Sequence, residues 1–187
     1  MAALPQRQTW TDAEYLAFER EQEMRHELRH GQVYAMTGAS DEHNLITSST
    51  HVSLYLQLRG GACRVYQSDM RVKIDAGYVY PDLVVACGER RFTDDHVDTL
   101  INPALIIEVL SPSTERYDRG EKFQSYRGIA TLQSYVLISQ HEPRIEHFQR
   151  REQMWALTEA IGLDAVMPLP AVNCTLKLAA VYEQITF

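Results

Sequence analysis

The sequence has few cysteines and no long apolar segment, and each absence excludes a class of protein. Its 187 residues include three cysteines, Cys63, Cys87 and Cys174, which are far apart in the chain and form no CxxC pair. We expect each to be a small buried hydrophobic residue, which favours a cytoplasmic protein in a reducing compartment. The longest apolar runs, such as LVVAC and ALII, are too short to span a membrane, so no membrane partner is expected.

The signatures of several common enzymes are also missing. There is no GxSxG motif of serine hydrolases, and no GxxxxGK or GxGxxG loop that would bind a nucleotide. His26 and His30 are four residues apart, but Gly31 and a strand-like context argue against the helical histidine pair of a zinc hydrolase. The first residues, MAALPQRQTW, contain neither a basic nor an apolar segment, so we expect no secretory signal.

Positive charge is scarce. Lys and Arg total 18 against 25 for Asp and Glu, a formal net charge of −7, which argues against a protein that coats nucleic acid through a general basic surface. An enzyme whose acids bind a metal and whose basic groups line one groove stays compatible with this charge. Candidates for such a DNA-contact surface are Arg64, Arg71, Lys73, Arg116, Arg119 and Arg127. Because they alternate with acids, a solvated charged surface is the alternative.

The composition that is present predicts one globular domain. Hydrophobic residues make up 45% of the chain and charged residues 23%, which is ordinary for a soluble protein with a sizeable core. We divide the expected domain into an N-terminal helix and hairpin extension (1–38), a core (39–150) and C-terminal packing elements (151–187).

The first half of the chain predicts helices and a hairpin. Residues 11–23 begin with a Thr or Asp cap and form a short amphipathic helix, and HELRHGQVYAM reads as two strands that turn at Gly31. A longer helix ends at Gly60 and Gly61, with an apolar face predicted from the helical spacing of several large residues. These residues are Leu45, Val52, Tyr55 and Leu56.

The second half predicts strands that are covered on both faces. CRVYQSDMRVKIDAG alternates apolar and charged residues, while YVYPDLVVAC and ALIIEVL are continuous apolar runs of strand length. Asp118, followed by Glu121, predicts a capping box at the start of the helix RGEKFQSYRG. QSYVLIS and RIEHFQR should pair around a turn at residues 141–143. The expected fold class is α/β (α+β), a mixed central sheet flanked by helices.

Three residues on neighbouring elements predict a metal site. Asp82 stands at the start of one apolar strand, Glu108 lies near the end of another, and Lys122 falls in the helix that follows. Two buried carboxylates would repel each other, and each is costly to bury alone. Mg²⁺ removes both costs, because it prefers oxygen ligands and takes one or two carboxylates while keeping waters for a phosphate.

Each of these residues also has a plainer interpretation. Asp82, which follows a proline, could cap a turn, and Glu108 could pair with Arg71, Lys73 or another cation. Lys122 alone would be a solvated helix residue. The combination of the three favours the metal site.

The same segments carry a resemblance to a known family. YPDLVV, LIIEVLSPST, DRGEKFQSYRG and QSYVLI occur in an order that closely resembles the Uma-type family of endonucleases. That family belongs to the restriction-endonuclease-like superfamily, which is named for a PD-(D/E)xK pattern. RHELRHGQVYAMTGASDEHN and SDMRVKI are similar to the family's N-terminal block and its first long strand, so the resemblance covers roughly residues 10 to 185.

The resemblance implies a restriction-endonuclease-like core and a phosphodiesterase site that depends on Mg²⁺, with Mn²⁺ as the alternative ion. Asp82 matches the aspartate of the pattern and Glu108 its second acid. The superfamily lysine would stand two places later, where this chain has Leu110, but the Uma-type lysine is on the next helix, where Lys122 matches it. A long, flexible lysine stem can deliver its amine from that different position.

Two further residues match the family pattern. Glu27 is interpreted as a supporting ligand of metal or water, or else as a surface acid of the hairpin. His43 is interpreted as a contact to phosphate or an auxiliary base, or else as a histidine that hydrogen-bonds at the start of a helix.

The predicted function is therefore Mg²⁺-dependent hydrolysis of DNA phosphodiester bonds, with in-line attack by water. RNA is an alternative substrate. A catalytically inactive binding or regulatory module with the nuclease fold is the alternative function, because a fold does not by itself confer activity. A homodimer would suit the cutting of both strands of a duplex.

Overall fold

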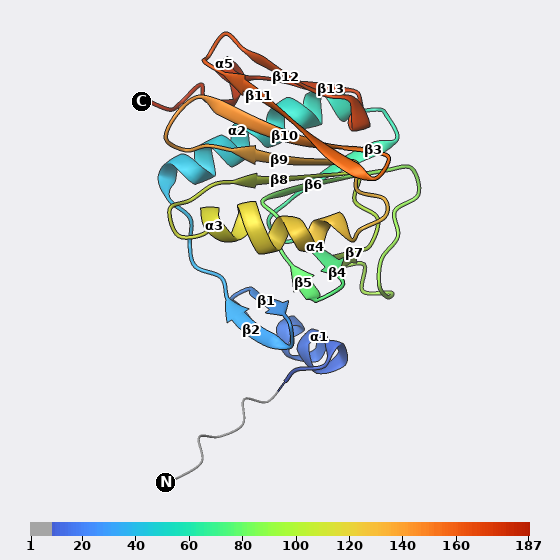
Figure 1. The fold of residues 1–187 in the computed structure, drawn as a ribbon. Coiled ribbons are helices and arrows are strands. Elements are labelled where there is room, and N and C mark those ends of the chain that lie inside the picture. Colours follow the sequence, from blue (N-terminus) through green and yellow to red (C-terminus); the bar gives the residue numbers. More distant parts are fainter. Residues whose placement is uncertain (1–8) are drawn as a thin grey trace.

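The computed structural model describes residues 9–187, which form a five-stranded and a six-stranded β-sheet with helices between and around them (Figure 1). Most of the segment on which the absence of a secretory signal was predicted, residues 1–8, lies outside the described residues. Within residues 9–187, no helix has both the length and the apolar character needed to cross a membrane.

The N-terminal part contains the predicted helix and hairpin. Helix α1 (Asp12–Arg20) begins at Thr11, whose hydroxyl accepts from the Glu14 N–H while the Glu14 carboxylate accepts from the Thr11 N–H, which is a capping box. Strands β1 (His26–Arg29) and β2 (Gln32–Ala35) follow as an antiparallel hairpin. They turn at His30 and Gly31, where φ is positive at 48° and 74°.

The hairpin is part of a five-stranded sheet, called here the small sheet, of order β2-β1-β5-β4-β7. Its other strands are β4 (Arg71–Ile74), β5 (Gly77–Val79) and β7 (Thr99–Leu100). Gly77 permits the close approach of β5 to β1, because a Cβ at this position would lie 2.0 Å from the Leu28 carbonyl oxygen. This glycine therefore lets the hairpin dock against the body of the protein.

The large sheet has six strands in the order β11-β10-β9-β8-β6-β3. Their bounds are β3 (Cys63–Gln67), β6 (Leu83–Cys87), β8 (Leu105–Val109), β9 (Ser134–Ile138), β10 (Arg144–Arg151) and β11 (Met154–Ile161). β8 and β9 are parallel and the other pairs are antiparallel, so the predicted mixed sheet and the pairing around residues 141–143 are confirmed. The alternating segment CRVYQSDMRVKIDAG is not one strand, since β3 and β4 belong to different sheets.

Helices cover both faces of the large sheet (Figure 1). On one face lie α2 (Asp41–Leu58), the two-stranded sheet of β12 (Val166–Leu169) and β13 (Cys174–Lys177), and α5 (Leu178–Val181), with a 3₁₀ turn η2 (Pro170–Val172) between the two strands. On the other face, one continuous helical segment lies between the two sheets. It consists of α3 (Glu115–Tyr117), a π-helical turn η1 (Asp118–Lys122) and α4 (Phe123–Arg127).

The apolar face predicted for α2 is wrong. Val52, Tyr55 and Leu56 are more than half exposed, whereas Ile46 and Leu54 are fully buried against the large sheet. The buried positions of α2 include Thr47 and Thr50 beside the apolar residues, so threonines contribute to the packing stripe while several large apolar residues face solvent. Contact with the sheet, and not side-chain hydrophobicity, decides which side of this helix is covered.

The prediction of three reduced cysteines is wrong for two of them. Cys63 and Cys87 face each other in the antiparallel pair β3–β6 and are joined by a disulfide with an S–S distance of 1.98 Å. Their separation in the sequence hid this pairing, because only the strand register brings them opposite each other. Cys174 is a buried free thiol, as predicted.

Candidate active site

Asp82 and Glu108 meet at the end of the antiparallel pair β6–β8. They lie one residue beyond the paired Leu83 and Ile107, on adjacent strands of the large sheet. The Val109 N–H donates to Asp82 Oδ2 over 2.7 Å, and the Asp82 N–H is 3.4 Å from Glu108 Oε2. Strand pairing therefore brings the two predicted carboxylates together.

Lys122 reaches the same place from the π-helical turn. Its Nζ is 2.9 Å from Glu108 Oε1, 3.6 Å from Asp118 Oδ1 and 3.7 Å from Glu27 Oε1. Single π turns inside α-helices often occur at functional sites, because they redirect side chains that a regular helix would place elsewhere. The Lys122 side chain is only 7% exposed, so the interpretation as a solvated helix residue is wrong.

Asp118 does not cap a helix as predicted. Its backbone is helical, with φ of −63° and ψ of −40°, because the helical segment begins earlier, at Glu115. The side chain is buried and belongs to the cluster around Lys122. The sequence contained a signal for this, since Asp118 and Lys122 are four residues apart and lie on one helix face.

Glu27 joins this cluster from the hairpin. Its side chain is 8% exposed, and Oε1 accepts from the Tyr80 N–H over 3.0 Å. The alternative of a surface acid is therefore wrong. Pairing of β1 with β5 holds Glu27 over the helical segment, so the small sheet supplies one side of the site and the large sheet the other.

Two neutral or weakly basic groups orient the predicted metal ligands. The Tyr126 hydroxyl, one turn after Lys122, donates to Glu108 Oε1 over 2.7 Å in a fully buried contact. His43 lies at the start of α2, and its Nε2 is 3.1 Å from Asp82 Oδ2. Burial is the largest single influence on the His43 imidazole and would lower its pKa, but the hydrogen bond to Asp82 and the charges of Asp82 and Asp118 together raise it.

The cluster contains more carboxyl groups than basic groups. Burial raises the pKa of the Glu108 carboxyl well above its usual value, against the opposing charge of Lys122. Burial also raises the pKa of Asp118. For Lys122, burial would lower the pKa of the amine, but the nearby carboxylates outweigh it and the pKa is raised. A bound cation would favour the ionised forms of these carboxyl groups and so lower their pKa values.

The donor atoms fit a magnesium ion better than a softer metal. Among residues 9–187, no three His, Cys, Asp or Glu side chains converge into a fully protein-ligated metal site. Mg²⁺ does not require one, since it binds through one or two carboxylates and completes its octahedron with water. Asp82 and Glu108 carry hard oxygen donors and stand at neighbouring positions of adjacent strands. The Asp82 side chain is 21% exposed, so the site is open to solvent on the Asp82 and His43 side.

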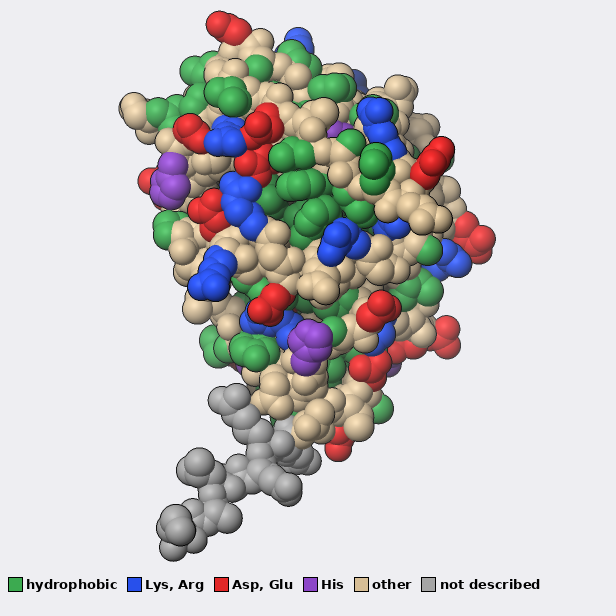
Figure 2. All heavy atoms as spheres, viewed as in Figure 1, with side chains coloured by type: hydrophobic (Ala, Val, Ile, Leu, Met, Phe, Trp, Pro, Cys, Tyr) green, Lys and Arg blue, Asp and Glu red, His purple; other side chains and the backbone are tan. Residues whose placement is uncertain are grey.

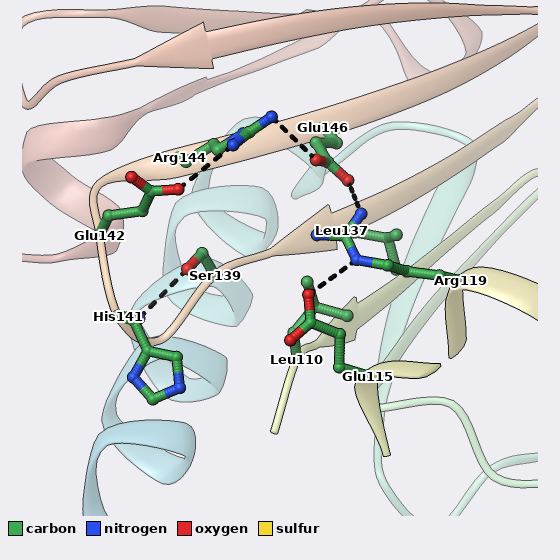
Figure 3. A pocket seen from close by; sticks show the side chains of 9 residues that line it. All are labelled: Leu110, Glu115, Arg119, Leu137, Ser139, His141, Glu142, Arg144 and Glu146. Atoms are coloured by element: carbon green, nitrogen blue, oxygen red, sulfur yellow. Dashed lines mark hydrogen bonds and ion pairs between the residues drawn. The ribbon is translucent and has the colours of Figure 1, made fainter. Parts of the chain in front are cut away.

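A cavity of about 290 Å³ lies beside these residues on the same face of the large sheet. Figure 3 shows Arg119 and Arg144 on either side of Glu146, which forms ion pairs with both. Neither Asp82, Glu108 nor Lys122 lines this cavity, whose arginines are already neutralised by acids. It is therefore a neighbouring hollow and not the catalytic pocket.

The predicted basic DNA-contact residues do not act as a group. Arg71 is 2% exposed and forms an ion pair at 2.5 Å with the partly exposed Asp98, so it is unavailable to a ligand. Lys73 pairs with Asp12, and Arg119 with Glu115 and Glu146. Figure 2 shows acidic and basic side chains interspersed over one face of the molecule. The alternative of a solvated charged surface describes the exposed members better.

The chain matches a family model along most of its length. The model, Uma2, described as "Putative restriction endonuclease", matches residues 12–180. Two proteins of Synechocystis sp. (strain ATCC 27184 / PCC 6803 / Kazusa), both named as uncharacterized, are similar in sequence. One is 39% identical over 158 residues, covering 83% of this chain and 89% of the relative, and the other is 33% identical over 177 residues, covering 93% and 92%.

A solved structure has the same fold. The crystal structure of "a putative nuclease belonging to DUF820" from Anabaena variabilis ATCC 29413 superposes with a TM-score of 0.76, covering 92% of this chain and 97% of that one. The sequence identity is 18%, so the likeness concerns the fold alone. The predicted fold class, a mixed sheet flanked by helices as in a nuclease, is confirmed.

Proposed function

This chain belongs to the Uma2 family, and from that premise we propose that it is a Mg²⁺-dependent endonuclease that hydrolyses phosphodiester bonds in DNA. The observation that carries the proposal is the convergence of Asp82, Glu108 and Lys122 from three separate elements, with the Lys122 amine 2.9 Å from Glu108.

Each residue has a role that its position supports. Asp82 and Glu108 hold the cation, and the hydrogen bonds from Val109 and Tyr126 keep the two carboxylates in place. Mg²⁺, when bound, supplies Lewis-acid stabilisation of the charge that develops on the phosphate. Lys122 orients the attacking water or a phosphate oxygen through its N–H donors. Glu27 fixes the position of the Lys122 amine from the hairpin side.

The alternative is a binding or regulatory module that lacks catalysis. The close pairing of Glu108 with Lys122 favours it, because this pair satisfies both groups in the absence of a metal. RNA as substrate and Mn²⁺ as the ion are variants of the enzymatic proposal. A homodimer would place one site on each strand of a duplex substrate, whereas a single-stranded substrate needs only one site.

The test is a cleavage assay on plasmid DNA, single-stranded DNA and RNA with Mg²⁺ or Mn²⁺. We expect Asp82→Asn and Glu108→Gln to lose more than about 100-fold in rate, beyond what substitutions of supporting residues cost. The matched control is Glu121→Gln, an exposed acid next to Lys122 that should cut like the wild type. Equal cutting by all four proteins would refute the site. Binding to nucleic acid without cutting by the wild type would favour the inactive module.

A further inference from the structure

An arginine is enclosed between two tyrosine rings beside the candidate active site. The Arg29 Cζ lies 3.9 Å from the ring centroid of Tyr34 and 4.3 Å from that of Tyr117. Arg29 comes from β1, Tyr34 from β2 and Tyr117 from α3. We call these three side chains, which are linked by two cation–π contacts, the Tyr34–Arg29–Tyr117 stack.

This stack adjoins the catalytic residues through a single carboxylate. Glu27 Oε2 is 3.6 Å from Arg29 Nε, and Glu27 Oε1 is 3.7 Å from Lys122 Nζ. The Lys122 amine is also 5.9 Å from the centroid of the Tyr117 ring. A nucleotide whose phosphate lies at Lys122 would therefore have this stack as a neighbour.

The register of the hairpin directs the stack toward the site. Glu27 and Tyr34 are directly opposite each other in the β1–β2 pair, so their side chains project from the same face, as does that of Arg29 two residues on. Leu28 and Val33 project from the other face and pack with the hydrophobic cluster of α1. One face of the hairpin therefore packs against the core, and the other faces the candidate site.

The outer end of the stack is open to solvent. Tyr34 is 44% exposed, whereas Arg29 and Tyr117 are partly buried. Arg29 Nε is buried and has no hydrogen-bond partner among the described residues, so stacking and the nearby Glu27 charge hold this end of the guanidinium. A stack that only tied the hairpin to α3 would not need an exposed aromatic ring at its end.

Aromatic rings and arginine planes bind nucleic acids chiefly by stacking on unpaired bases. In a duplex, each base face is covered by the neighbouring base pair, so the ring has no face to contact. We propose that the Tyr34–Arg29–Tyr117 stack binds an unpaired base next to the scissile phosphate, which makes single-stranded DNA the preferred substrate. This inference rests on the proposed function and names its substrate class.

The test measures DNA binding by fluorescence anisotropy without divalent cations, so that affinity is measured apart from cleavage. The ligands are a labelled single-stranded oligonucleotide, its duplex, and a series of single strands that each carry one abasic position. The proteins are the wild type, Tyr34→Ala, Tyr34→Leu and Tyr34→Phe. The control is Tyr55→Ala, which removes a tyrosine that is 55% exposed on α2.

We expect the wild type to bind the single strand more tightly than the duplex. Tyr34→Ala and Tyr34→Leu should each weaken single-strand binding about tenfold and leave duplex binding unchanged, while Tyr34→Phe and Tyr55→Ala behave like the wild type. For the wild type, a single strand with the base missing at one particular position should show the same loss of affinity. Tyr34→Ala should bind that strand no more weakly than it binds the intact single strand. Tyr34→Leu keeps an apolar contact with Arg29, so it reports on stacking even where Tyr34→Ala unfolds.

The inference would be overturned if the Tyr34 variants lost equal affinity for single strand and duplex. It would also be overturned if every abasic position weakened binding by Tyr34→Ala as much as it weakens binding by the wild type. Either result would leave the proposed function intact. Failure of the wild type to bind any nucleic acid would overturn both.

Discussion

The Lys122 amine and Glu108 Oε1 lie 2.9 Å apart, and both side chains are almost fully buried. The pair links the helical segment to the central strand of the large sheet. Glu27 and Asp118 surround the same amine, so Lys122 is the shared counter-ion of three buried carboxyl groups. Stability and the proposed catalysis therefore depend on one residue.

Replacing Lys122 with methionine should destabilise the protein strongly. Lys122→Met keeps the stem volume but leaves Glu27, Glu108 and Asp118 without their cation, and we expect a loss of about 3 kcal/mol in the free energy of unfolding. Chemical denaturation measures it. The control is Lys73→Met, which removes a partly exposed ion pair with Asp12 and should cost less than about 1 kcal/mol. Equal costs for the two variants would contradict the shared counter-ion.

Magnesium should stabilise the folded protein through Asp82 and Glu108. A ligand that binds only the folded state at 100 times its dissociation constant adds about 2.7 kcal/mol to the free energy of unfolding. We expect Mg²⁺ to raise the melting temperature of the wild type and of Glu121→Gln, and to leave Asp82→Asn unchanged. Thermal unfolding in a magnesium titration checks this without any assay of activity. An identical shift in Asp82→Asn would place the ion elsewhere.

Removing the Tyr126 hydroxyl should weaken the support of Glu108. Tyr126→Phe deletes a buried hydrogen bond of 2.7 Å to Glu108 Oε1 and changes little else, so we expect a loss of about 1.5 kcal/mol in the free energy of unfolding. Tyr55→Phe, at an exposed position of α2, should stay within about 0.5 kcal/mol of the wild type. Denaturant titrations of both variants measure these changes. If Tyr126→Phe has the same free energy of unfolding as the wild type, Glu108 does not need this donor.

Reducing the Cys63–Cys87 disulfide should lower stability. The bond closes a loop with a sequence separation of 24, for which chain entropy predicts about 3 kcal/mol. We expect a reductant to lower the free energy of unfolding of the wild type and of Cys174→Ala, but not that of a double variant with serine at Cys63 and Cys87. Thiol titration of the denatured protein gives an independent reading, since three free thiols without reductant would mean that no bond forms.

The free energy of unfolding should decrease as the pH is lowered from 6.5 to 4, because of His147. Burial lowers the pKa of this imidazole from its ordinary 6.5 to about 4, and Nε2 lies 2.9 Å from the Ser134 hydroxyl. The unfolded state therefore binds more protons between these two values, so the free energy of unfolding rises with pH across this window and its contribution is complete above pH 6.5.

The expected loss from pH 6.5 down to 4 is about 3 kcal/mol, relative to a variant without an ionisable group at this position. His147→Gln supplies that reference, because it stays neutral and can still hydrogen-bond to Ser134. Denaturation of both proteins across the pH range isolates the histidine, and parallel curves would show that its pKa is not lowered by folding.

Local sequence patterns predicted the structure correctly where the whole pattern lies within one element. The capping box of α1, the turn at His30 and Gly31, and the apolar runs of β6 and β8 each correspond to the predicted structure. The mixed sheet followed from the order of these elements. Asp82, Glu108 and Lys122 were selected as a set because carboxylates at strand ends and a lysine in the next helix are costly to bury separately.

Other features required contacts between distant segments. The burial of Arg71 depends on Asp98 and Thr99, which a separate loop and strand supply. The Asp118 side chain faces Lys122 because the helical segment starts earlier than the capping signal indicated and then widens into a π turn. Local patterns cannot report such partners.

The sequence by itself determined the elements, the family and the acids at the strand ends, because these depend on spacing along the chain. Only the tertiary structure decided which groups surround Lys122, how Cys63 meets Cys87, and that Tyr34 projects beside Glu27. The physical reason is that strand register and sheet packing set distances between residues far apart in the chain. Charge, burial and stacking energies follow from those distances.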